Sequence, residues 1–162
     1  MEPIELTIGI LLQQHGLKLA LAESCTGGLV ADRITNIPGS SEYLLGGIVA
    51  YAYEAKVALL GVSWDTLHQY GAVSSETARE MARGARNALG ADLAISISGI
   101  AGPGGGMPGK PVGYTWFGLS TAAGDWTRNS TWNADRRANK AASAEAALQF
   151  LLDYLQHPEK FR

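Results

Sequence analysis

Ala22-Glu23-Ser24-Cys25-Thr26-Gly27-Gly28 is the stretch where a strand pattern changes into a helix pattern. Residues 17–22 form an apolar run typical of a strand, and residues 29–34 have the spacing of a helix. Such a turn places hydroxyl groups at a helix N-terminus, where unpaired backbone N–H groups and the positive dipole end favour an anion or an oxyanion. We therefore expect a nucleophilic Ser24 if a base lies nearby. The more common alternative is that Ser24 or Thr26 only caps the helix.

Helix and strand patterns alternate along the rest of the chain. Apolar periodicity and stop signals predict helices at residues 4–15, 26–35, 54–60, 63–68 and 135–155, and a further helix that is capped by Ser74 or Ser75 and ends at Leu89. Composition predicts strands at residues 17–22, 44–53, 93–97, 112–120 and 126–132. The second of these strands is apolar on both sides of its alternation, so we expect it to be buried. Because Gly124 marks a hairpin between the last two strands, the pattern predicts a layered α/β domain with a mixed sheet.

Length and composition are those of one globular domain. The chain has 162 residues, of which 46% are hydrophobic and 17% are charged, so we expect a single domain over residues 1–162. The formal net charge of −2 argues against nucleic acid as a partner. The closest approach to a basic stripe is formed by Arg136, Arg137 and Lys140.

Several features favour a cytoplasmic protein. The single cysteine, Cys25, leaves no internal disulfide and fits a reducing compartment. The acidic start of the chain, residues 1–5, lacks the basic region of a signal peptide. No apolar stretch approaches the roughly 20 residues that span a bilayer, so we expect no membrane association.

Polar residues gather in three loops that follow predicted strands, at residues 23–28, 51–56 and 98–110. Ligands of open α/β sheets bind beyond the carboxyl ends of parallel strands, so these loops meet in one cleft if their strands run parallel. Lys56 is the first candidate base for Ser24, because burial lowers the pKa of a lysine toward neutrality. The alternative is a solvated helix lysine that pairs with Glu54 or with nothing.

Cys25 is a rival nucleophile, since a thiol at a helix N-terminus has a lowered pKa. No histidine lies in a loop where it would serve as the base, because the three are scattered at His15, His68 and His157. The same scatter argues against a histidine metal cluster, and the dispersed acidic residues give little support to a paired-carboxylate or divalent-metal site. We therefore expect no metal.

A long Gly/Pro loop over residues 98–111 follows the third predicted strand. Its backbone N–H groups suit an anion-binding nest, although it lacks the Gly-Lys-Ser/Thr of a Walker loop and the helix that follows a dinucleotide-binding motif. Arg136 and Arg137 open the last predicted helix, where cations oppose the dipole, so a bound phosphate would explain them. The alternative for the loop is a flexible connection without a ligand. The alternative for the two arginines is that the negative charge of Asp135 offsets their positive charge.

Several motifs in a fixed order resemble the CinA C-terminal domain family over nearly the whole chain. They are residues 22–28, Gly-Gly-Ile-Val-Ala-Tyr at 46–51, Glu-Ala-Lys at 54–56, Tyr-Gly-Ala-Val-Ser at 70–74, Ser-Gly-Ile-Ala-Gly-Pro at 98–103 and Lys-Pro-Val-Gly at 110–113. The family includes stand-alone bacterial nicotinamide-nucleotide amidases. The chain looks like this form, since no molybdopterin-binding-like domain precedes the motifs.

The resemblance implies a fold and an activity. The fold is an α/β, three-layer α/β/α sandwich with a mixed, mainly parallel sheet of about five or six strands. The activity is hydrolysis of the carboxamide of nicotinamide mononucleotide to nicotinate mononucleotide and ammonia, in pyridine-nucleotide salvage. The resemblance implies no metal or organic cofactor, and it implies assembly into a homodimer or a larger homo-oligomer.

The resemblance also implies roles for particular residues. Ser24 is the nucleophile and Lys56 the general base, and Tyr51 belongs to the same motif as Lys56. The implied substrate-binding residues are Cys25, Thr26, Gly27, Gly28, Ser98, Gly99, Gly102, Gly105 and Arg136. In this scheme N–H groups around residues 26–28 stabilise the oxyanion, while Arg136 and the Gly-rich loop hold the 5′-phosphate.

The chain departs from the family's pattern at three positions. Tyr53 stands where the family often has Asn, Ser98 where many members have Thr, and Ala134 where the family has Gly. Tyr53 bears most on the identity of the substrate. Two alternatives to the serine amidase remain: a non-catalytic nucleotide-binding or regulatory module linked to competence or DNA damage, and an enzyme with Cys25 as nucleophile in the same cleft.

Overall fold

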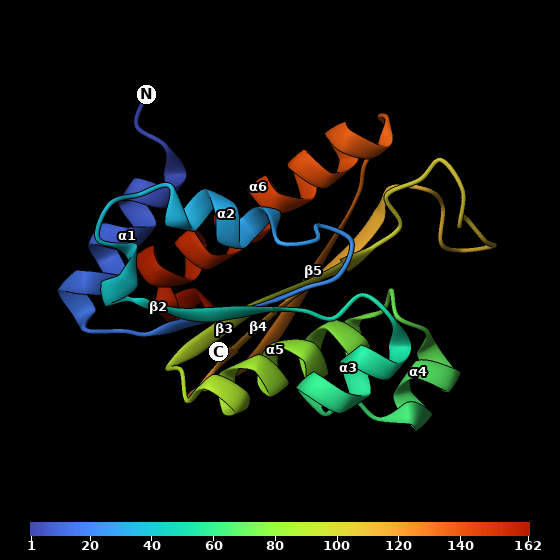
Figure 1. Ribbon diagram of the computed structural model, residues 1–162, viewed down its shortest axis with the longest axis horizontal. Helices are drawn as coiled ribbons and strands as arrows, with labels where there is room; N and C mark the ends of the chain where they lie inside the picture. Colours follow the sequence, from blue (N-terminus) through green and yellow to red (C-terminus); the bar gives the residue numbers. More distant parts are fainter.

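A mixed sheet of five strands runs through the computed structural model, which describes residues 1–162 (Figure 1). The strands are β1 (Leu19–Glu23), β2 (Leu44–Val49), β3 (Leu93–Gly99), β4 (Tyr114–Thr121) and β5 (Gly124–Thr131), in the spatial order β2-β1-β3-β4-β5. β1 pairs in parallel with β2 and β3, whereas the β3–β4 and β4–β5 pairs are antiparallel. β4 is therefore the one strand that runs against the other four.

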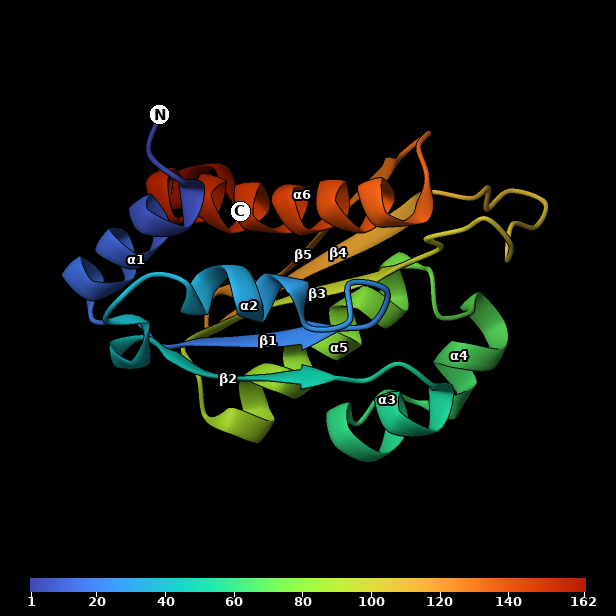
Figure 2. The same ribbon diagram turned by 45° about the horizontal axis from the view of Figure 1, so that its top comes forward.

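Helices cover both faces of the sheet, as Figure 2 shows. One face carries α1 (Ile4–His15), α2 (Leu29–Thr35) and α6 (Arg136–Gln156), and the other carries α3 (Tyr53–Leu60), α4 (Trp64–Tyr70) and α5 (Ser75–Leu89). Two 3-10 turns, η1 (Ser40–Glu42) and η2 (Pro158–Lys160), complete the elements. The predicted three-layer α/β/α sandwich with a mixed sheet is thus confirmed. None of the helices has both the length and the apolar character that a bilayer crossing requires.

The two faces of the sheet are packed differently. The side of α1, α2 and α6 holds large apolar side chains, among them Ile8, Leu21 and Phe150, which are almost fully buried. The side of α5 depends on small residues. A Cβ on Gly118 of β4 would lie 2.3 Å from the backbone oxygen of Ala78 in α5, so only glycine fits there. α5 therefore packs directly against β4 in the middle of this face of the sheet.

β2 is an edge strand, and the prediction of a buried strand over residues 44–53 is wrong. Its one neighbour is β1, and along β2 half-buried residues alternate with exposed ones. Leu45 is 44% exposed and Val49 is 47% exposed. An apolar run does not by itself distinguish a central strand from an edge strand. β2 also ends earlier than predicted, at Val49, and Tyr53 begins α3.

α2 begins at Leu29 rather than at residue 26. Gly27 and Gly28 have φ angles of 61° and 105°, in the left-handed region that glycine adopts without strain. The two glycines therefore form a turn of their own between β1 and α2. This turn separates the hydroxyl and thiol side chains from the helix proper.

Candidate active site

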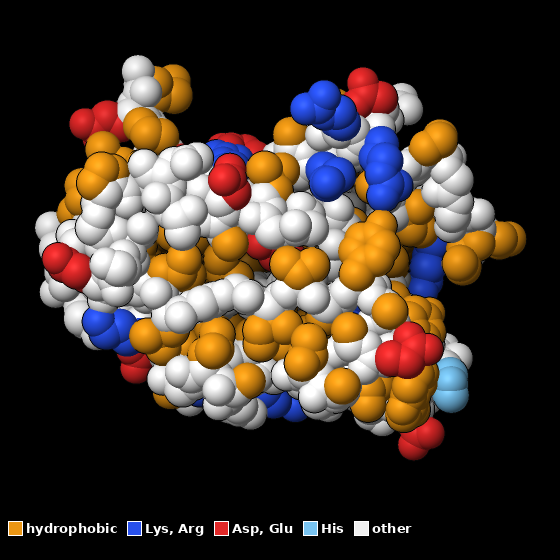
Figure 3. Space-filling model, viewed as in Figure 1, with side chains coloured by type: hydrophobic (Ala, Val, Ile, Leu, Met, Phe, Trp, Pro, Cys, Tyr) orange, Lys and Arg blue, Asp and Glu red, His pale blue; other side chains and the backbone are white.

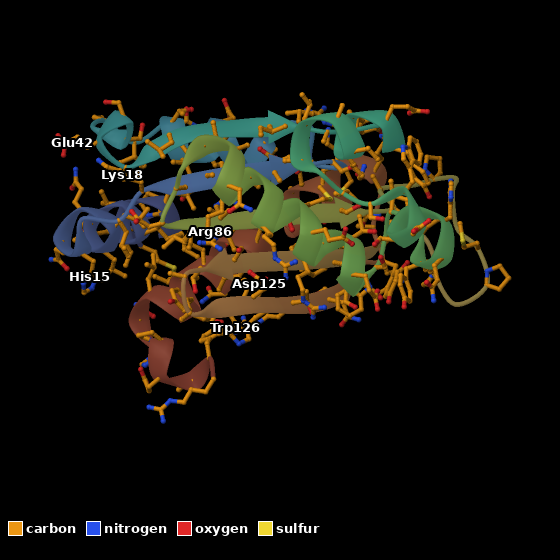
Figure 4. The ribbon with its side chains drawn as sticks, turned by 90° about the horizontal axis from the view of Figure 1, so that it is seen from below. His15, Lys18, Glu42, Arg86, Asp125 and Trp126 are labelled. Atoms are coloured by element: carbon orange, nitrogen blue, oxygen red, sulfur yellow. The ribbon has the colours of Figure 1, made fainter.

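The three polar loops meet at one edge of the sheet. Because β1, β2 and β3 run parallel, the loops that follow them leave the same edge, as the sequence predicts (Figure 2). At the opposite end, where β2 begins, Figure 4 shows His15, Lys18 and Glu42. His15 is therefore too far away to act on the groups at the carboxyl edge.

Ser24 and Lys56 are in direct contact at this carboxyl edge. The Lys56 Nζ atom lies 3.0 Å from Ser24 Oγ, 2.9 Å from the carbonyl oxygen of Ala50 and 3.0 Å from that of Tyr51. Lys56 is 1% exposed and forms no ion pair. Burial lowers the pKa of Lys56 from its usual range to about 8. The alternative of a solvated lysine paired with Glu54 is wrong.

The partners of Lys56 orient its amine. The carbonyl oxygens of Ala50 and Tyr51 belong to the connection between β2 and α3, and they can only accept hydrogen bonds. A neutral amine has two N–H donors and one lone pair. When it donates to both carbonyl oxygens, its lone pair is left for the third partner, the hydroxyl of Ser24. The geometry thus suits transfer of the serine proton to Lys56.

Glu23 caps α2, and the expectation that Ser24 or Thr26 does so is wrong. Glu23 Oε1 accepts from the N–H groups of Gly28 and Val30 at 3.2 and 3.0 Å, and Oε2 accepts from that of Ala31 at 3.1 Å. The carboxylate is 1% exposed. Its negative charge beside the positive end of α2 stabilises the turn that carries Ser24. Sequence reasoning missed this role because Glu23 precedes the first N–H group it caps by five residues, beyond the usual N-cap spacing.

Two backbone N–H groups beside Ser24 make no hydrogen bond to another residue. Gly27 donates to the backbone oxygen of Ser24, and Gly28 donates to Glu23, so neither is available to an oxyanion. The N–H groups of Cys25 and Thr26 donate to no other residue. The backbone N–H groups that could bind an oxyanion are therefore those of residues 25 and 26, whereas the sequence predicted those around residues 26–28. The hydroxyl of Thr26 is also buried without a hydrogen-bond partner.

Cys25 is less suited than Ser24 to act as a nucleophile. Burial raises the pKa of its thiol to about 11, contrary to the lowering expected at a helix N-terminus. The thiol therefore stays protonated near neutral pH. No group of three or more His, Cys, Asp or Glu side chains lies close enough to hold a metal ion.

Arg136 links Tyr51 to the Gly-rich loop through two hydrogen bonds. Its Nη1 atom donates to the backbone oxygen of Gly102 at 2.8 Å, and its Nη2 atom donates to Tyr51 Oη at 3.1 Å. Asn139, one turn further along α6, is 1% exposed and donates to the backbone oxygen of Ala101 at 3.0 Å. The start of the loop is thus held against α6. Sequence reasoning missed Asn139, because an asparagine within a helical pattern carries no signal of its loop partner.

The remaining predicted binding residues have structural roles. Ser98 is buried, and its hydroxyl donates to the backbone oxygen of Ala72 at 2.8 Å. A Cβ on Gly99 would lie 2.5 Å from Thr115 Oγ1, and one on Gly102 would lie 2.4 Å from Val112 Cγ1. These glycines therefore allow close packing of the loop against β4 and the segment before it.

Gly105 and Tyr53 take no part in the hydrogen bonds that hold Lys56 and Ser24 together. Gly105 has a φ angle of 91° and belongs to the Gly-rich loop, which projects beyond the sheet (Figures 1 and 2). Tyr53 opens α3, and its hydroxyl lies near Gly71 and Lys110. The substitution of Tyr for Asn at position 53 therefore changes the surface beside the end of α4 rather than the contact itself.

The fold and this site define a class: a three-layer α/β/α domain with a buried serine–lysine contact at the carboxyl ends of three parallel strands. The chain belongs to the CinA family, since the model of the CinA C-terminal domain matches residues 1–155.

Relatives of known sequence agree with this membership. A CinA-like protein of Chloroherpeton thalassium is 50% identical over 157 residues, covering 94% of this chain and 37% of that protein. A CinA-like protein of Geobacter metallireducens is 47% identical over 150 residues, covering 93% of this chain and 36% of that protein. The chain thus spans little more than a third of the length of these curated relatives.

Solved structures match the chain almost end to end. The competence/damage inducible protein CihA of Agrobacterium tumefaciens has a TM-score of 0.91 and 37% identity, covering 94% of this chain and 93% of that one. The competence damage-inducible protein A (ComA) of Klebsiella pneumoniae has a TM-score of 0.92 and 33% identity, covering 95% of this chain and 96% of that one.

Proposed function

We propose that this protein is an amidase that hydrolyses the carboxamide of nicotinamide mononucleotide to nicotinate mononucleotide and ammonia. The observation that carries the proposal is the 3.0 Å contact between Lys56 Nζ and Ser24 Oγ in a buried setting. A serine activated by a neighbouring lysine is a recurring form of hydrolytic nucleophile. The sequence resemblance to nicotinamide-nucleotide amidases supports this substrate and a place in pyridine-nucleotide salvage.

Acylation begins when neutral Lys56 takes the proton of the Ser24 hydroxyl and Ser24 Oγ bonds to the carboxamide carbon. The carbonyl oxygen becomes an oxyanion, which receives the free N–H groups of Cys25 and Thr26. The Lys56 ammonium then returns the proton to the amide nitrogen as the carbon–nitrogen bond breaks. Ammonia leaves, with an ester on Ser24 and a neutral Lys56 behind it.

Deacylation reverses these roles with water in place of the serine. Lys56 takes a proton from water as the water oxygen bonds to the acyl carbon, and the same two N–H groups receive the second oxyanion. The ester bond breaks, and Lys56 returns the proton to Ser24 Oγ. The products are the carboxylic acid and the starting form of the enzyme.

The test is ammonia release from nicotinamide mononucleotide by the purified, metal-stripped protein. We expect release by the wild type and none above background by Ser24→Ala or Lys56→Ala. Matched controls are Ser41→Ala and Lys160→Ala, which remove the same groups at exposed positions and are expected to retain the wild-type rate. Turnover by Ser24→Ala would refute the assignment of the nucleophile.

A second candidate is a nucleotide-binding or regulatory module without catalysis. It is favoured by the names of the solved relatives, which are competence- or damage-inducible proteins. The same assay distinguishes the two functions. Binding of the mononucleotide by a folded wild-type protein, without ammonia release, would support the regulatory module and reject the amidase.

A further inference from the structure

Asn139 is a buried polar residue that has no part in the proposed reaction steps. Lys and Arg side chains gather on the surface over the start of α6 (Figure 3), whereas Asn139, on the same helix, is 1% exposed. Its Nδ2 atom donates to the backbone oxygens of Ala101 and Ala134 at 3.0 Å each, and its Oδ1 atom accepts from the N–H of Ala134 at 3.1 Å. Ala101 lies near the start of the Gly-rich loop and Ala134 precedes α6, so one side chain joins these two segments.

The hydrogen bonds of Asn139 differ from those of its buried neighbour Ser143. Ser143 Oγ donates to the backbone oxygen of Asn139 at 2.8 Å and accepts from Trp132 Nε1 at 2.9 Å. Ser143 is 2% exposed, and its hydroxyl makes no bond to the Gly-rich loop. Loss of the polar atoms of either side chain would leave buried groups without partners, which is destabilising. Both residues therefore stabilise the packing of α6, but Asn139 is the one that reaches the loop.

A series of hydrogen bonds leads from the loop contact of Asn139 to the proposed general base. Gly102, in the segment that Asn139 holds, accepts from Arg136 Nη1 at 2.8 Å. Arg136 Nη2 donates to Tyr51 Oη at 3.1 Å, and the backbone oxygen of Tyr51 accepts from Lys56 Nζ at 3.0 Å. Because Tyr51 is 60% exposed, packing alone restrains it little, and its position depends on the bond to Arg136.

Building on the proposed amidase, we propose that Asn139 is a positioning residue for the reaction. By holding the start of the Gly-rich loop, it keeps Tyr51 in place, and with Tyr51 the backbone oxygen that orients the Lys56 amine. Asn139 itself bonds to neither Lys56 nor Ser24. A displaced carbonyl oxygen would turn the lone pair of the amine away from the serine hydroxyl, and proton transfer requires hydrogen-bond geometry. The effect of Asn139 is therefore on the rate of the chemical step rather than on binding.

The kinetic test is Asn139→Leu, which keeps the size of the side chain and removes its polar atoms. We expect kcat for ammonia release from saturating nicotinamide mononucleotide to fall by about threefold to tenfold, the equivalent of one hydrogen bond, with a smaller change in KM. The matched control is Ser143→Ala, which removes buried hydrogen bonds from the same helix. It is expected to lower the midpoint of urea unfolding, as Asn139→Leu does, and to leave kcat unchanged.

A double-mutant cycle tests the route through Tyr51. Tyr51→Phe removes the hydroxyl that Arg136 holds and so breaks the series of hydrogen bonds at that point. In the Tyr51→Phe protein, Asn139→Leu is expected to lower kcat no further. Equal factors in the wild-type and Tyr51→Phe backgrounds would overturn the proposal, and so would a loss carried by KM alone. If Asn139→Leu does not fold, Asn139→Ala, which has the highest helix propensity, takes its place in both experiments.

Hydrogen exchange separates this proposal from the proposed amidase, because it requires no turnover. The backbone N–H groups of residues 50–56, none of which bonds to Asn139, are expected to exchange about threefold to tenfold faster in Asn139→Leu than in the wild type. In Ser143→Ala they should exchange at the wild-type rate. Faster exchange in Asn139→Leu, in a protein that releases no ammonia, would reject the amidase and keep the role of Asn139 in holding Tyr51. Unchanged exchange would reject that role, whether or not ammonia is released.

Discussion

Ammonia release is expected to rise with pH as Lys56 loses its proton. With the pKa of Lys56 lowered to about 8 by burial, the neutral fraction is about 10% at pH 7, about 50% at pH 8 and about 90% at pH 9. The rate should therefore increase by about 30-fold between pH 6.5 and 9.5, with a midpoint near 8. An ordinary lysine, with a pKa of about 10.4, would give a rate that is still rising at pH 9.5.

The assay is kcat/KM for ammonia release across this range at constant ionic strength, because this ratio reports the pKa values of the free enzyme. The phosphate of the mononucleotide titrates at a pKa of about 6, just below the range. Nicotinamide riboside, which has the same carboxamide and lacks the phosphate, provides a control, because its profile reports Lys56 without that group. Lys160→Ala, which removes an exposed lysine, should leave the midpoint unchanged.

Two results would refute the reasoning. A flat or falling profile would mean that no group with a pKa near 8 has to lose a proton for the reaction. A rate that is still rising steeply at pH 9.5 would mean that the group that has to lose its proton has a pKa well above 8, as an ordinary lysine or the buried thiol of Cys25 has. That second result would contradict a Lys56 amine whose pKa is lowered by burial.

Three further predictions concern the groups around the contact. Glu23→Gln should lower the free energy of unfolding by about 1–3 kcal/mol. The reason is that the amide nitrogen of Gln would face a backbone N–H group whose hydrogen bond a carboxylate oxygen of Glu23 now accepts. An unchanged midpoint of urea unfolding would contradict this. The free energy of unfolding of the wild type should rise between about pH 8 and 10.4, where unfolded Lys56 is still protonated and folded Lys56 is not. Lys56→Met should lack this rise, and parallel pH–stability curves would count against the lowered pKa. Cys25→Ala should keep most of the ammonia release, and an inactive but folded Cys25→Ala would oppose Ser24 as nucleophile.

Much of the fold follows from local patterns in the sequence. The switch from a strand pattern to a helix pattern at residues 22–28, together with the hairpin at Gly124, is enough to predict a mixed sheet with helices. The position of β2 at the edge of the sheet is not predictable in this way. It depends on which strands pair across long separations, and an apolar run such as residues 44–53 fits either an edge or a central place.

The candidate site is also predictable from the sequence only in part. The meeting of the loops that carry Ser24 and Lys56 follows from parallel strands and the rule that ligands bind at their carboxyl ends. The capping role of Glu23 and the loop contact of Asn139 depend on the exact path of the backbone. The rules for helix caps use residue spacing alone and do not describe that backbone path. The sequence therefore indicated the wrong residues as the cap of α2.

The cap formed by Glu23 also limits where the two negative charges of the proposed reaction, the oxyanion and the phosphate, can be held. Glu23 accepts from the N–H groups of Gly28, Val30 and Ala31, so these three donors are not available to a phosphate, and the carboxylate offsets the positive end of the α2 dipole. Only the N–H groups of Cys25 and Thr26 remain there, and two donors suit the single oxygen of an oxyanion. In the proposed amidase, the phosphate of the substrate therefore needs a separate source of positive charge, for which Arg136 at the start of α6 is the residue that the family resemblance implies. On this proposal, the buried carboxylate of Glu23 keeps the site of the reacting carbonyl oxygen apart from the site of the substrate's anionic end.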